Sequence, residues 1–135
     1  MEITAIIEKG NDGLFSIYSE QELGNHGLGG YGESVEIAKT DFMQSIDEAK
    51  EMIKEETGSV PEEFDGLKVT FKFDLASFFN YFDCINTSKF ARYAGINESK
   101  MRQYKSGSAF AGEQTTRKIM AAIKKLGTEL SEATL

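Results

Sequence analysis

The chain has 135 residues, of which 40% are apolar and 27% are charged. That size and composition are typical of one compact domain or two very small ones, and they argue against a disordered chain. No apolar run approaches the roughly 18 residues of a membrane span. The first ten residues carry Glu2 and Glu8, whereas a secretory signal would be basic and apolar there. We therefore expect a cytoplasmic protein with no membrane partner.

The net charge of −7 conceals an uneven distribution. Residues 1–84 hold 6 Lys+Arg and 18 Asp+Glu, a balance of −12, whereas residues 85–135 hold 9 and 4, a balance of +5. A basic segment attracts polyanions such as nucleic acid, and an acidic segment suits solvent or a basic protein. The two parts of the chain are therefore expected to have different partners.

The acidic part begins with short strands and one long helix. Apolar residues alternate along 3–7 and 14–19 on either side of the turn 10–13, which predicts a β-hairpin. A short strand is expected at 29–32. After Ser34, a suitable N-cap, apolar residues recur at steps of three and four, which predicts a helix that ends near Gly58. Its expected buried side consists of Val35, Ala38, Phe42, Ile46, Ala49 and Ile53.

The apolar period changes once more near residue 74. Strict alternation over residues 67–73 predicts a strand with one buried face. Beyond it the apolar spacing is helical throughout, and the last helix is expected over residues 113–126. We therefore predict an α+β fold: a small βββαβ domain over residues 1–74, for partner binding and dimerisation, followed by an all-α helix-turn-helix bundle over residues 75–135.

The segment that follows residue 87 has the spacing of a helix-turn-helix. Ala91 is small enough for a second helix to cross the first, and Gly95 can adopt the positive φ of a tight turn. Ile96 is placed to fill the angle between the two helices. Asn97 is a suitable N-cap for the second helix, and Gly107 is suitable for its C-terminal end. These features predict a second helix of about ten residues.

Polar and basic side chains occupy the second helix opposite its apolar positions. Arg102 suits a guanine edge and Gln103 an adenine edge, whereas lysines suit phosphates. The side chains expected to bind DNA are Asn97, Ser99, Lys100, Arg102, Gln103 and Lys105, together with Lys89 and Arg92 on the first helix. One such helix contacts few base pairs, so we expect a homodimer or a higher homo-oligomer on a double-stranded operator with two half-sites. The expected function is sequence-specific transcriptional regulation.

Two stretches of the acidic part resemble the N-terminal domain of HicB-family antitoxins: MEITAIIEKGNDGLFSIYS and GESVEIAKTDFMQSIDEAKEMI. Two stretches of the basic part are similar to the helix-turn-helix of regulators in that family: INESKMRQYKSG and TTRKIMAAIKKLGTEL. The resemblance implies a partial, catalytically degenerate RNase H-like fold that masks a basic HicA-type mRNA-cleaving toxin. It also implies a dimeric module that represses its own operon.

The chain departs from the family pattern at one turn. Family members usually carry a Pro-Gly-Cys-like turn before the long helix, and this chain has Leu23-Gly24-Asn25-His26-Gly27 there. An orphan regulator that kept the fold without the toxin is therefore an open alternative. A second alternative, from another class, is a protein-interaction adaptor whose C-terminal helices bind a protein and no DNA.

Two patterns that an enzyme could use, a nucleotide-binding motif and a carboxylate cluster, are incomplete in this sequence. Gly27, Gly29 and Gly32 match GxGxxG, but no strand ends at the first glycine, so a loop with a short strand is preferred to a nucleotide site. An active RNase H needs clustered carboxylates for two metal ions, and the acidic residues Glu8, Glu33 and Asp74 show no such spacing.

The chain has one histidine and one cysteine, so neither an internal disulfide nor the usual His/Cys zinc site can form within it. We expect His26 to be an exposed loop residue and Cys84 a small buried apolar one. No catalytic residue, metal or cofactor is predicted.

Overall fold

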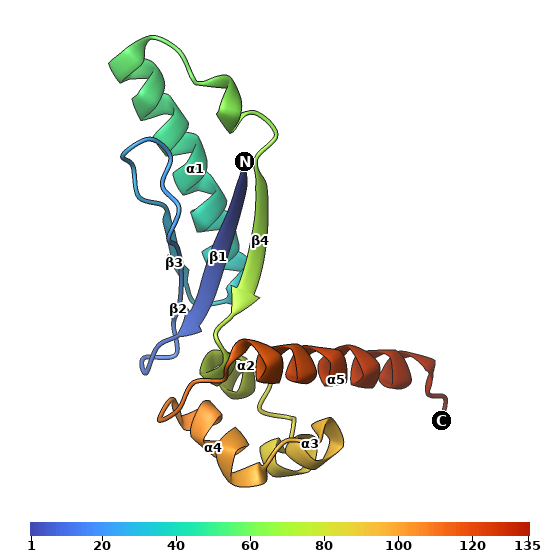
Figure 1. Ribbon diagram of the computed structural model, residues 1–135. Helices are drawn as coiled ribbons and strands as arrows, with labels where there is room; N and C mark the ends of the chain where they lie inside the picture. Colours follow the sequence, from blue (N-terminus) through green and yellow to red (C-terminus); the bar gives the residue numbers. More distant parts are fainter. The chain divides into compact units, whose positions relative to one another are not determined.

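The computed structural model describes all residues, Met1–Leu135, and has an α+β fold (Figure 1). The chain divides into two compact units, Met1–Ser77 (unit 1) and Phe78–Leu135 (unit 2). The division lies within the short helix α2 (Leu75–Tyr81), close to the boundary that the sequence analysis placed between residues 74 and 75. No helix combines the length and the apolar character that crossing a membrane requires.

Unit 1 contains a four-stranded mixed sheet. The predicted hairpin is confirmed, with β1 antiparallel to β2, and β4 lies parallel to β1 on its other side. The strand order is β3-β2-β1-β4, so β3 and β4 are the two edges. The strands are β1 (Glu2–Lys9), β2 (Phe15–Ser19), β3 (Gly29–Gly32) and β4 (Lys68–Phe73). The predicted order of three strands, a helix and a fourth strand is confirmed.

Helix α1 (Val35–Thr57) covers one face of this sheet (Figure 1). The Ser34 hydroxyl accepts a hydrogen bond from the Ile37 amide at 3.1 Å, and Gly58 ends the helix with a φ of 86°. All six apolar residues that the spacing assigned to the inner side are buried, against Ile3, Ala5 and Ile7 of β1. A short 3-10 turn (η1, Glu62–Phe64) follows and buries Phe64.

The glycines of β3 let the strand approach α1 closely. A Cβ atom at Gly30 would lie 2.5 Å from the Phe42 nitrogen and would also overlap the Ala38 carbonyl oxygen. A Cβ atom at Gly32 would lie 2.5 Å from Ile37 Cγ2. These distances are too short for any side chain, so the strand needs glycine at both positions to pack against the helix.

Unit 2 is entirely helical and packs around Phe79, which is fully buried. The Phe79 ring meets those of Phe78 and Phe90 edge-on, with centroid distances of 5.3 and 5.8 Å. From α2 onward the helices are α3 (Thr87–Ala94), α4 (Glu98–Ser106) and α5 (Glu113–Glu132).

Helix α5 is longer than predicted, because it continues past Leu126 and Gly127 to Glu132. A glycine costs a helix only about 1 kcal/mol relative to alanine. The Tyr93 hydroxyl of α3 donates to the Glu129 carboxylate at 3.1 Å, a contact that holds the added turns against α3.

Two predictions about single residues are wrong. Cys84 is exposed rather than buried, because it lies in the turn between α2 and α3 while phenylalanines fill the neighbouring core. His26 is not an exposed loop residue, since only 19% of its side chain is accessible. Backbone hydrogen bonds between Leu23 and His26 hold this loop, and the His26 Nε2 lies 3.4 Å from the Glu56 carboxylate of α1.

Candidate nucleic-acid interface

Helices α3 and α4 are joined by a tight turn with the predicted chemistry. Gly95 ends α3 with a φ of 72°, a conformation that side chains disfavour. The Ile96 amide returns to the Ala91 carbonyl at 2.8 Å, and Ala91 is fully buried. The Lys118 ammonium of α5 donates to the Gly95 carbonyl at 2.8 Å, so α5 also fixes this turn.

Helix α4 begins and ends where the sequence predicted. The Asn97 carboxamide oxygen accepts from the Lys100 amide at 3.0 Å, and Gly107 ends the helix with a φ of 79°. Met101 and Tyr104 are buried on the inner side. The opposite side is consequently presented to solvent, with polar side chains along its length.

The eight predicted DNA-contacting residues are accessible, but they are not equivalent. Seven are exposed and Lys105 is half-buried. The Asn97 side-chain oxygen is occupied by the N-cap, so its expected contact would have to come from the remaining amide group. The exposed seven are Lys89, Arg92, Asn97, Ser99, Lys100, Arg102 and Gln103.

Two of these residues meet at a carboxylate. Glu98 Oε1 lies 2.8 Å from Arg92 Nε, and Glu98 Oε2 lies 3.9 Å from Arg102 Nη1. Arg102 Nη1 also donates to the Ser88 hydroxyl of α3 at 3.1 Å. We call these four residues, Ser88, Arg92, Glu98 and Arg102, the arginine–glutamate cluster. The lysines at 89, 100 and 105 form no ion pair with a carboxylate.

Sequence reasoning missed Ser88 as part of this surface, and it placed Lys118 on the outward side of the last helix without its contact to the Gly95 carbonyl. Ser88 is 14 residues from Arg102 along the chain, and Lys118 is 23 residues from Gly95. No local spacing relates either pair, because the crossing of the helices alone brings them together.

The cations of α5 are mostly engaged within unit 2. Arg117 pairs with Glu113 one helical turn earlier, and Lys118 is held by the Gly95 carbonyl. Lys125 lies over the Tyr93 ring, with its nitrogen 5.5 Å from the ring centroid. Burial and the hydrogen bond to the Glu129 carboxylate both raise the pKa of Tyr93. The freest cations of unit 2 therefore belong to α3 and α4.

Unit 1 presents a different kind of surface on the sheet face opposite α1, which we call the open sheet face. Strand alternation places Glu8, Tyr18 and Tyr31 on it, and the two tyrosines are 42% and 52% exposed. The Tyr18 hydroxyl donates to Glu8 at 3.1 Å, and the Tyr31 hydroxyl to Asp12 at 3.4 Å. Burial, followed by these carboxylates, raises the pKa of both phenols.

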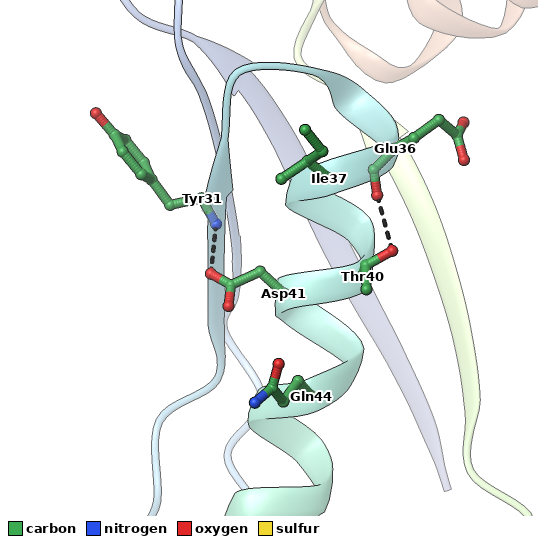
Figure 2. A pocket seen from close by; sticks show the side chains of 6 residues that line it. All are labelled: Tyr31, Glu36, Ile37, Thr40, Asp41 and Gln44. Carbon is green, nitrogen blue, oxygen red and sulfur yellow. Dashed lines mark hydrogen bonds between the residues drawn. The ribbon is translucent and has the colours of Figure 1, made fainter.

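The neighbouring edge of the sheet is closed by α1. The outward amide of Tyr31 donates to Asp41 at 2.9 Å, and that of Gly29 donates to Ser45 at 3.2 Å. Figure 2 shows Asp41 reaching from α1 to the strand while the Tyr31 ring points away from the helix. The six residues drawn there line a surface hollow between β3 and the first turns of α1. An added strand would find these two donors already occupied.

No three His, Cys, Asp or Glu side chains are grouped so that they could hold a metal ion. Glu8, Glu33 and Asp74 accordingly form no such group.

Comparison with protein-family models, with curated proteins and with solved structures gave no match to this chain.

Proposed function

We propose that the chain is a sequence-specific DNA-binding transcriptional regulator in which α3 and α4 form a helix-turn-helix. In this proposal α4 enters the major groove, where Arg102 and Gln103 read base edges. The observation that carries it is the solvent-facing side of α4, whose polar residues are flanked by lysines that no carboxylate neutralises. Unit 2 holds 9 Lys+Arg and 5 Asp+Glu, a balance of +4 that favours approach to a polyanion.

The proposal includes a homodimer. A single helix in the groove contacts few base pairs, and useful affinity normally requires two half-sites about one DNA turn apart. Unit 1, with its separate core, would be the dimer contact. In this proposal unit 2 supplies the DNA-binding surface, and dimerisation through unit 1 sets the distance between the two α4 helices of the dimer.

Two substitutions test the DNA surface with a duplex that the wild-type chain selects from a random pool. Lys105→Ala is expected to weaken binding to all duplexes and to reduce the slope of log K against log salt by about one, the value for one lost phosphate contact. Arg102→Ala is expected to relax preference at one base position, by about 1 to 3 kcal/mol. Electrophoretic mobility shifts at several salt concentrations, with permuted duplexes, measure both.

Lys124→Ala on α5 is the matched control for charge, because this exposed lysine lies outside the α3–α4 surface. It is expected to leave the salt slope nearly unchanged. If the wild-type chain selects no duplex and its weak affinity for DNA does not change with salt concentration, a protein-interaction adaptor becomes the better explanation of unit 2.

A second proposed function rests on unit 1: a HicB-like antitoxin that masks a basic HicA-type mRNA interferase and represses its own operon. In this proposal the βββαβ arrangement is a partial RNase H-like fold without catalytic activity. Unit 1 holds 6 Lys+Arg and 17 Asp+Glu, a balance of −11. The open sheet face adds aromatic rings beside carboxylates, a combination that suits arginine and lysine side chains of a partner.

The open sheet face can be tested with a charge reversal. If a small basic reading frame neighbours this gene, Glu8→Lys is expected to weaken binding to its product about tenfold, because it opposes like charges across the contact. Titration calorimetry measures the affinity, and rescue of growth measures masking. Glu63→Lys in η1 is the control, since it makes the same charge change at an exposed residue outside the sheet. Equal effects of the two variants would contradict this contact.

A further inference from the structure

Glu98 is the only carboxylate between residues 85 and 112, a stretch that holds five cations. It lies in the first turn of α4, on the surface proposed to face DNA. A carboxylate there repels phosphates, so a surface built only for affinity would not contain it. Its contacts give a specific reason for its presence.

Both oxygens of Glu98 are used, and they join two helices. Oε1 binds Arg92 of α3 at 2.8 Å, and Oε2 faces Arg102 of α4 at 3.9 Å. The Ser88 hydroxyl holds Arg102 from a second side at 3.1 Å. Arg102 therefore has a defined position in the free protein, and half or more of each arginine side chain remains accessible, at 64% and 56%.

We propose that Glu98 is a specificity-determining residue. By pairing with Arg92 and Arg102, it weakens their attraction to the phosphates of unrelated DNA, and it positions Arg102 to contact one base. This inference rests on the proposed DNA-binding function. At an unrelated sequence, each phosphate contact of these arginines must replace an ion pair with Glu98, so little binding free energy is gained. At the operator, two hydrogen bonds from Arg102 to a guanine edge outweigh the lost ion pair.

The Glu98→Gln substitution keeps the shape of the side chain and removes its charge. It is expected to strengthen binding to a scrambled duplex about tenfold and to steepen the salt slope by about one to two, because two arginines become free for phosphates. Binding to the selected duplex is expected to improve far less, so the ratio of the two affinities falls by about tenfold. Fluorescence anisotropy with both duplexes, over a series of salt concentrations, measures all three quantities.

Glu113→Gln is the matched control. Glu113 also occupies the first turn of a helix in unit 2 and pairs with one arginine, Arg117, so the change in net charge is the same. It is expected to leave the affinity ratio within about twofold of the wild-type value. Equal effects of Glu98→Gln and Glu113→Gln would overturn the inference, since a general gain of positive charge would then explain both.

Glu98→Asp separates positioning from charge. Aspartate keeps the charge but is one methylene shorter, so it cannot reach both arginines. Loss of discrimination by this variant supports the bridging role, and wild-type discrimination would refute it. Thermal denaturation of each variant checks that unit 2 remains folded. Failure of the wild-type chain to select any duplex would refute the proposed function itself, whereas a selective wild type with unaltered Glu98 variants would refute this inference alone.

Discussion

The Phe79→Ala substitution is expected to lower the free energy of unfolding of unit 2 by about 3 to 5 kcal/mol, the usual cost of deleting a buried phenylalanine ring. Phe79 is fully buried and packs edge-on against Phe78 and Phe90, so its removal leaves a cavity between α2 and α3. Such a loss approaches the whole stability of a small domain. The position of α4 depends on this core, so the proposed DNA binding is expected to weaken with it.

Hydrogen exchange measured by mass spectrometry resolves the effect by region. We expect faster exchange throughout α3 and α4 and little change in the sheet of unit 1, because each unit is compact by itself. Phe110→Ala is the control, since this ring is 91% exposed in the same unit. It is expected to change stability by less than about 0.5 kcal/mol. Similar losses for both variants would mean that Phe79 is not at the centre of the core.

The Gly30→Ala substitution is expected to destabilise unit 1 by about 3 kcal/mol, at the upper end of the cost of overpacking. The added methyl group would overlap backbone atoms of Ala38 and Phe42, and backbone inside a helix cannot rotate away as a side chain can. The strand β3 would have to separate from α1, with loss of the amide contacts to Asp41 and Ser45. Urea denaturation followed by circular dichroism measures the change.

Gly29→Ala provides the comparison on the same strand. A Cβ atom at Gly29 meets only the Ile17 carbonyl oxygen at 3.6 Å, an ordinary contact, and its φ is not in the left-handed region. This variant is expected to be neutral or slightly stabilising, because alanine restricts the unfolded chain more than glycine does. A Gly30→Ala variant as stable as Gly29→Ala would show that β3 and α1 are not in close contact.

Local patterns in the sequence predicted most of the secondary structure. Alternation identified the hairpin and β4, and steps of three and four identified the buried side of α1. Cap and turn residues predicted both ends of α4 and the Gly95 turn. These features depend on residues within a few positions of one another, so a single sequence contains the information.

Other features depended on residues distant in the chain. Local spacing ended α5 at Leu126, because the Tyr93–Glu129 contact that supports its last turns crosses between helices. The short strand expected within the GxGxxG pattern is confirmed, but the need for glycine at Gly30 and Gly32 comes from the approach of α1. The exposure of Cys84 and the partial burial of His26 were likewise set by neighbouring elements.

The sequence by itself determined the α+β class, the order of the elements, the separation of an acidic and a basic part, and the polar side of α4, since each follows from period, capping or charge count. Only the tertiary structure decided which of those polar residues act together. Arg92, Glu98 and Arg102 meet with Ser88 because α3 and α4 pack against each other. A contact between helices depends on their crossing angle, which no local spacing encodes.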